Sequence, residues 1–206
     1  MNSKEMRFDP LFMRNTFSGG GRWEIPFIKK QPLISDKIAL IAYSDTRLHD
    51  LKENCQKGVH FFLDDYRFNV VYNQPRRVIQ RLSQYTFLLT PDYSTYADMQ
   101  PWRQLESVAH SRWCGAYWQS LGFVVYPTIT WSTPCSYYCF DGIERNAIVA
   151  IGMNGATQNN RKPFVRGYDA MLEHISPEAI ICLGTPFPEM RGHIICVDYH
   201  YPKGVK

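Results

Sequence analysis

The chain has 206 residues, 45% of them hydrophobic and 20% charged, which is typical of one globular domain with a full core and excludes a disordered chain. Its net charge of +4 is mildly basic, so a nucleic-acid partner is permitted but not required. No apolar run approaches the roughly 20 residues of a membrane helix, and no apolar signal core opens the chain. We therefore expect no membrane partner and a cytoplasmic location.

Residues 1–36 are expected to form an extended N-terminal arm, because a glycine-rich break at 18–21 and three prolines discourage regular structure. Aromatic side chains are expected to anchor this arm: Phe17, Trp23 and Phe27. Residues 37–206 are then expected to form a single α/β domain.

Seven short apolar runs in this domain predict buried parallel strands, because each run is apolar on both faces. The runs cover residues 38–43, 59–63, 86–89, 123–130, 147–151, 179–183 and 193–197.

Amphipathic stretches between the runs predict helices over 74–85, 101–121 and 162–175. Pro75 suits a first helical turn, and Gly122 suits the end of the second helix. A shorter helical turn is expected over 188–191.

Repeated βα units follow from this alternation. They favour a small or incomplete (β/α) barrel-like domain, and an open doubly wound parallel sheet is the alternative. In both architectures the working face lies beyond the carboxyl ends of the strands.

Acidic residues follow four of the seven runs: Asp45, Asp64 with Asp65, Asp92, and Asp198. Carboxylates that converge on one rim could bind a divalent cation or share general acid and base roles. Aspartate is also a favoured helix cap and turn residue, so a purely structural role remains open.

Five ordered motifs carry a resemblance: FFLDDYRF (61–68), LLTPDYSTY (88–96), CGAYWQSLG (114–122), VYPTITWS (125–132) and YYCFDGI (137–143). Together they resemble the bacterial and phage family called domain of unknown function 4417, over roughly residues 20–185. The resemblance implies an origin in a bacterium, phage or mobile element, but it implies no particular reaction.

Candidate site residues combine these motifs with the strand ends. We predict Asp64, Asp65 and Asp92 as catalytic groups and Arg67 as the binder of an anionic group. Trp131 and Tyr137 are predicted to stack on a ring, and Gln119 and Ser136 to contact the substrate.

Metal ligands give a weaker signal. Cys135 and Cys139 lack a second pair of ligands nearby, and Glu106 with His110 lacks a third ligand, so we assign no metal-binding residue. The cofactor stays unknown, with a divalent metal ion as a candidate. Cys182 and Cys196 are expected to be buried thiols.

Three functions remain open, and the sequence does not decide whether the chain is an enzyme. The first is a hydrolase or transferase acting on a nucleotide, nucleic acid or sugar-containing substrate through an acidic and aromatic pocket. The second is a non-catalytic binding protein that sequesters a small molecule or host protein. The third is a DNA-associated protein. The sequence does not define the oligomeric state.

Overall fold

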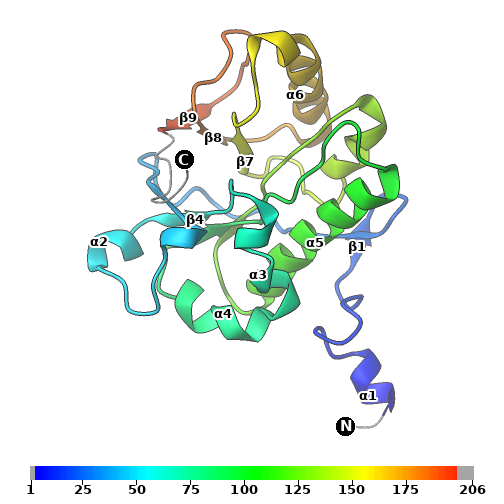
Figure 1. The fold of residues 1–206 in the computed structure, drawn as a ribbon, viewed down its shortest axis with the longest axis vertical. Coiled ribbons are helices and arrows are strands. Elements are labelled where there is room, and N and C mark those ends of the chain that lie inside the picture. Colours follow the sequence, from blue (N-terminus) through cyan, green and yellow to red (C-terminus); the bar gives the residue numbers. More distant parts are fainter. Residues whose placement is uncertain (1–2, 199–206) are drawn as a thin grey trace.

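Seven short parallel strands form the centre of the protein, as the computed structural model shows (Figure 1). The structure describes the backbone of residues 3–198 and the side chains of residues 5–198. The strands are β3 (Leu40–Ala42), β4 (Gly58–His60), β5 (Phe87–Leu89), β6 (Val125–Tyr126), β7 (Val149–Gly152), β8 (Ile180–Leu183) and β9 (Ile194–Val197). Each lies within or beside one of the seven predicted runs, so the α/β class is confirmed.

The strands follow one another in chain order. One ladder joins β3, β4, β5 and β6, and a second joins β7, β8 and β9. A parallel bridge between Thr128 and Ala150 connects the two ladders. This order lacks the reversal that defines a doubly wound sheet. Within residues 3–198 no ladder pairs β9 with β3, so a closed barrel stays a prediction.

Alternate strand residues point to opposite faces, and both faces are covered. In β5, Phe87 and Leu89 join an interior cluster that draws on side chains from all seven strands or their ends, while Leu88 packs outward against the helices. In β8, Ile181 and Leu183 point inward and Ile180 outward.

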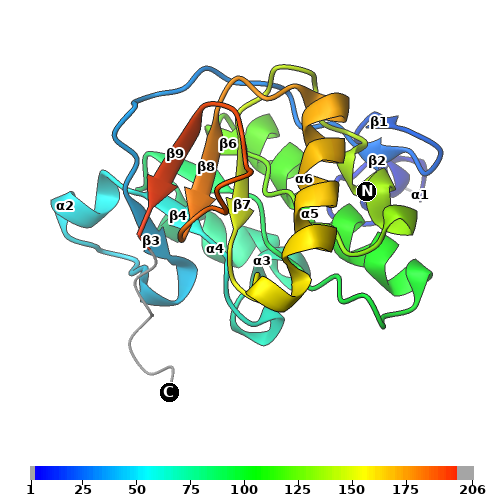
Figure 2. The same cartoon turned by 90° about the horizontal axis from the view of Figure 1, so that it is seen from above.

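Helices cover the face of the strands that points away from the interior cluster (Figure 2). They are α2 (Lys52–Cys55), α3 (Val70–Asn73), α4 (Pro75–Leu82), α5 (Pro101–Ser120) and α6 (Arg161–Ile175), and the longer connections hold the 3₁₀ helices η1 (Tyr43–Asp45), η2 (Asp65–Arg67), η3 (Pro134–Phe140) and η4 (Gln158–Asn160). The three long predicted helices are confirmed as α4, α5 and α6. Gly122 ends α5 with φ +88°, a conformation that favours glycine.

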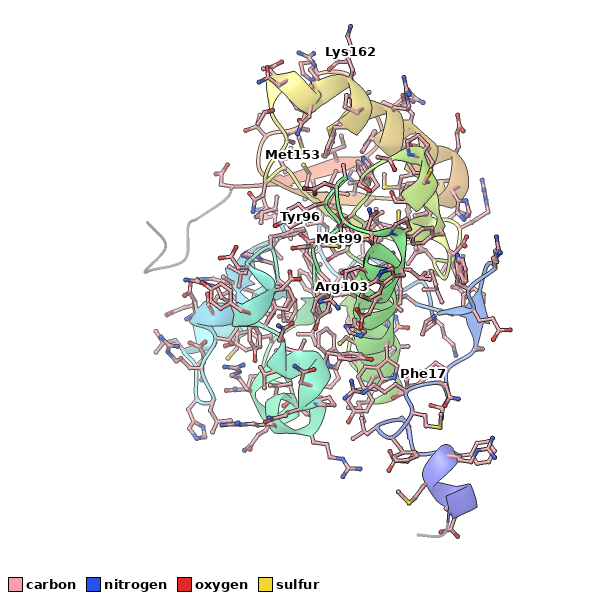
Figure 3. The ribbon with its side chains drawn as sticks, turned by 45° about the vertical axis from the view of Figure 1, so that its right-hand side comes forward. Phe17, Tyr96, Met99, Arg103, Met153 and Lys162 are labelled. Carbon is pink, nitrogen blue, oxygen red and sulfur yellow. The ribbon has the colours of Figure 1, made fainter. Side chains whose placement is uncertain are left out.

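The N-terminal arm is less extended than predicted. It contains α1 (Ser3–Arg7) and a small hairpin of β1 (Gly19–Gly20) and β2 (Ile25–Pro26). Phe17 packs against Trp113 of α5, as Figure 3 also places it, whereas Trp23 and Phe27 remain exposed. The buried anchors of the hairpin are instead Ile25 and Ile28.

Two smaller predictions were wrong. Residues 188–191 contain a turn and no helix. The backbone hydrogen bond from the Met190 amide to the Phe187 carbonyl closes this turn. Cys196 is exposed on β9, whereas Cys182 is buried on β8.

Candidate active site

A cavity of about 650 Å³ opens at the carboxyl ends of β4 to β7, and we call it the mouth pocket. Each of these strand ends contributes polar or aromatic side chains to its lining: Asp64 and Arg67 after β4, Asp92 after β5, Trp131 after β6 and Asn154 after β7. The predicted convergence of Asp64, Arg67, Asp92 and Trp131 on one cavity is therefore what the structure shows, while their roles stay predictions.

Asp92 has the most unusual environment of the acids in the mouth pocket. Thr90 and Pro91 carry the chain out of β5, and both are buried, so the following carboxyl group enters a poorly solvated site. Burial, with a smaller contribution from the neighbouring charge of Asp65, raises the pKa of Asp92 to about 7. A carboxyl with this pKa is partly protonated at neutral pH.

Asp65 lies beside the mouth pocket and not in its lining. Its carboxylate accepts hydrogen bonds from the Ser94 amide at 3.2 Å and from the Ser94 hydroxyl at 3.0 Å. These bonds tie η2 to the loop that follows Asp92. Two adjacent acids thus have contrasting surroundings, one hydrogen-bonded and one desolvated.

Asp64 and Arg67 lie at the two ends of η2, and both line the mouth pocket. Asp64 is exposed in the position before η2, and Arg67 ends the helix. Arg67 Nε donates to the Tyr66 hydroxyl at 3.4 Å. This hydrogen bond, with the charges of Tyr66, Asp64 and Asp45, raises the pKa of Arg67, so its guanidinium is charged at neutral pH.

Aromatic side chains form the opposite wall. The Trp131 ring lies 5.0 Å from Phe164 and 6.3 Å from Phe140 between ring centres. Gly167 of α6 permits this packing, because a Cβ atom there would lie 2.2 Å from the Trp131 indole. Tyr96, labelled in Figure 3, also lines the cavity.

A buried polar network connects β5, α5 and β6 directly behind the mouth pocket. The Thr90 hydroxyl accepts from Ser111 at 3.0 Å and from the Thr128 amide at 2.9 Å, and the Thr128 hydroxyl donates to the Thr90 carbonyl at 2.7 Å. Asp92 and Trp131 follow Thr90 and Thr128 closely in sequence, so this network fixes the strand ends that carry them.

Arg112 of α5 extends the network. It is only 2% exposed, and it donates to the carbonyls of Thr128 at 3.0 Å and Cys139 at 2.7 Å. Burial lowers the pKa of Arg112 to about 10, so it stays charged at neutral pH. Sequence reasoning missed this role, although the small residues Ser107, Ser111 and Gly115 at spacings of four indicate close packing on that face of α5.

Three predicted contact residues lie outside the mouth pocket. The Gln119 amide bonds to the backbone of Lys29 at 2.9 and 2.8 Å, so it fastens the N-terminal arm to α5. Ser136 is buried and donates to the Thr133 carbonyl at 2.7 Å. Tyr137 lines a different cavity along α6, and burial raises its pKa.

Asp45 and Asp198 are also separate from the mouth pocket. They line a second cavity of about 870 Å³ between β3 and the end of β9, which we call the seam cavity. Arg67 lines both cavities.

Residues 5–198 contain no group of three or more histidine, cysteine, aspartate or glutamate side chains placed to hold a metal ion. The divalent-metal hypothesis therefore stays a prediction. Glu106 and His110 form a surface pair with Nε2 3.8 Å from the carboxylate. His60 is buried at the end of β4, and desolvation lowers its pKa to about 4.

The fold and the mouth pocket define an α/β protein with an acidic and aromatic cavity at the carboxyl ends of parallel strands. The model of the family described as domain of unknown function (DUF4417) matches residues 17–200, so the chain belongs to this family and the resemblance read from its motifs is confirmed. No helix within residues 3–198 has both the length and the apolar character that a membrane span requires.

Two curated relatives are phage proteins. The Gene 1 protein of Mycobacterium phage L5 is 36% identical over 181 residues, which cover 86% of this chain and 78% of the relative. The Gene 1 protein of Mycobacterium phage D29 is also 36% identical over 181 residues, which cover 66% of its length. No solved structure matches the chain.

Proposed function

We propose that this protein is an enzyme that hydrolyses, or transfers a group from, a nucleotide, nucleic acid or sugar-containing substrate, with Asp92 as the general acid. The observation that carries the proposal is that two acids with contrasting surroundings line the mouth pocket, the poorly solvated Asp92 and the exposed Asp64. Pairs of carboxyls with different surroundings commonly divide the acid and base roles of such reactions.

Proton donation at neutral pH requires a carboxyl that still holds its proton. Burial of Asp92 favours the neutral acid. Asp92 would protonate the leaving group as its bond to the substrate breaks. Asp64, exposed in the same pocket, would accept the proton of the attacking water or acceptor hydroxyl as its oxygen forms the new bond to the substrate.

Substrate binding would use the other walls. A cavity of about 650 Å³ falls within the range of small-molecule sites, which is roughly 300–1,000 Å³. Trp131 and Phe164 offer an aromatic wall for a base or sugar ring, and Arg67 offers a guanidinium for an anionic group.

The phage relatives support a setting within bacterial cells that carry a phage or mobile element, and we propose a cytoplasmic location there. A divalent ion bound jointly by Asp64 and the substrate is compatible with this scheme. Its test is a shift in the midpoint of thermal unfolding, Tm, when Mg²⁺ or Mn²⁺ is added together with a ligand.

The direct test is a turnover screen. Purified protein is incubated with nucleosides, nucleotides and sugar phosphates, with and without Mg²⁺, and products are separated by chromatography. We expect turnover of one substrate class that Asp92→Asn abolishes and that the exposed-site control Asp36→Asn retains. Binding without turnover in the wild type would identify a non-catalytic binding protein and would refute the enzyme proposal.

A further inference from the structure

The seam cavity has an unbalanced charge. Four cationic side chains and two carboxylates line it: Arg47, Lys57, Arg67, Arg81, Asp45 and Asp198. Within residues 5–198, no ion pair joins any of the four cations to a carboxylate within 4.0 Å. The described lining therefore has more cations than carboxylates, four against two, and none of the four cations is held in a close ion pair within residues 5–198.

Neutral acceptors hold the cations in place. Arg81 of α4 donates to the Tyr43 hydroxyl and lies over the Tyr43 ring, 4.3 Å from its centre. Lys57 donates to the Asn54 side chain at 2.8 Å, and Arg47 reaches the Thr46 carbonyl at 3.5 Å. Such contacts orient the donors without cancelling their charge, which is the arrangement expected of an anion site.

Arg81 adds evidence from burial. It is only partly exposed, and desolvation lowers its pKa, so a guanidinium without an ion-pair partner among residues 5–198 is held here at a cost. A bound anion would offset that cost.

The two cavities meet at one residue. Arg67 lines both the mouth pocket and the seam cavity, and the seam cavity extends along β3 as far as Lys57, which precedes β4. A ligand with a ring at one end and phosphates at the other could therefore extend past Arg67 from one cavity into the other.

We propose that the seam cavity binds the phosphate chain of a nucleoside di- or triphosphate whose ring end occupies the mouth pocket. This inference rests on the proposed function for the location of the ring, but the phosphate subsite itself does not depend on catalysis. Arg81 and Lys57 would contact the terminal phosphate, and Arg67 would contact the phosphate nearer the sugar.

The test is isothermal titration calorimetry with three probes: inorganic pyrophosphate, a nucleoside, and the corresponding nucleoside 5′-diphosphate. Pyrophosphate should bind the wild type, and the nucleoside diphosphate should bind more tightly than either fragment. Arg81→Gln and Lys57→Gln should each weaken pyrophosphate binding about tenfold, because each removes charged hydrogen bonds. If Arg81→Gln does not fold because it loses the Tyr43 contact, Lys57→Gln alone tests whether the seam cavity binds phosphate.

The matched control is Arg77→Gln on the same helix, where the Arg77 guanidinium donates to the Gln74 side chain at 3.2 Å and lies outside the lining of both cavities. It should change pyrophosphate affinity by less than about twofold. Asp92→Asn should also leave pyrophosphate binding intact, so loss of turnover in that variant reports on the proposed function alone.

Equal pyrophosphate binding by the wild type, Arg81→Gln and Lys57→Gln would overturn the phosphate subsite, even if Asp92 proves catalytic. A nucleoside diphosphate that binds no more tightly than pyrophosphate would overturn the link between the cavities. Binding of a single-stranded oligonucleotide without binding of the mononucleotide would also contradict the proposal.

Discussion

The mouth pocket and the seam cavity meet at Arg67, but they differ in charge and in the contacts that support their walls. Acids and aromatic rings dominate the mouth pocket, whereas cations dominate the seam cavity. Behind the mouth pocket, the Thr90, Thr128 and Arg112 contacts join β5, α5 and β6. The seam cavity instead borders β3 and β9, which no ladder joins within residues 3–198.

This difference suits the two cavities to different roles, proton transfer in the mouth pocket and anion binding in the seam cavity. Proton transfer needs a donor held in a narrow range of positions, and rigid strand ends with a buried network provide that. Anion binding depends on charge and tolerates looser placement. Substitutions in and around each cavity can separate these two roles.

Asp92→Asn should reduce turnover by about 10²–10⁴-fold, the usual contribution of a general acid. The amide keeps the shape of the side chain but cannot release a proton to the leaving group. The rate constant kcat with the substrate found in the screen is the readout. A variant with wild-type kcat would show that the acid in the mouth pocket has no chemical role.

The same substitution should change how stability depends on pH. Folding raises the pKa of Asp92 to about 7, so between about pH 4 and pH 7 the unfolded chain ionises first and the wild type loses stability as pH rises. Asp92→Asn removes this loss, and it should be more stable than the wild type by about 2–4 kcal/mol at pH 8 but not at pH 4. Urea unfolding at both pH values measures this, and a difference that does not vary with pH would contradict it.

Arg112→Met should lower the free energy of unfolding by about 3 kcal/mol, because it leaves the carbonyls of Thr128 and Cys139 buried without donors. Ligand affinity at the mouth pocket should fall as well. The control is Arg103→Met on the same helix, where the side chain is 50% exposed and pairs with Glu106. Similar losses in both variants would show that the buried network is dispensable.

Gly167→Ala should destabilise the protein by about 1–3 kcal/mol and displace Trp131 into the mouth pocket, because the added methyl group meets the indole. Tryptophan fluorescence and ligand affinity should change together. Arg166→Ala, at the adjacent exposed position, should change neither. Unchanged fluorescence in Gly167→Ala would mean that Trp131 does not pack there.

Gln119→Ala should have the smallest effect, about 1 kcal/mol of stability, because it removes contacts between the arm and α5. Proteolysis within the arm should accelerate while affinity at the mouth pocket stays constant. Weaker ligand binding would restore the sequence-based prediction that Gln119 contacts the substrate.

Much of the fold could be predicted because buried parallel strands are apolar on both faces. That pattern located all seven strands, and amphipathic spacing located α4, α5 and α6. The α2 and α3 helices have only four residues each, too few to show a helical period. The hairpin of the arm was missed because it pairs only two residues on each side.

The mouth pocket could be predicted in part because parallel strands bring the residues that follow them to one rim. This rule found Asp64, Arg67, Asp92 and Trp131. It could not separate Asp65 from Asp64, since which side chain enters the pocket depends on how η2 turns. It also missed Arg112, a charged residue in a helix, and the seam cavity, whose cations come from four separate segments.

The general-acid role of Asp92 depends on the pKa of its carboxyl group, which carbon-13 NMR titration of the side-chain carboxyls can measure, with Asp92→Asn used to assign the signal. We expect a titration midpoint near 7, because burial disfavours the carboxylate. A midpoint near 4 would show a solvated carboxylate that holds no proton at neutral pH, and it would contradict the assignment of Asp92 as the general acid.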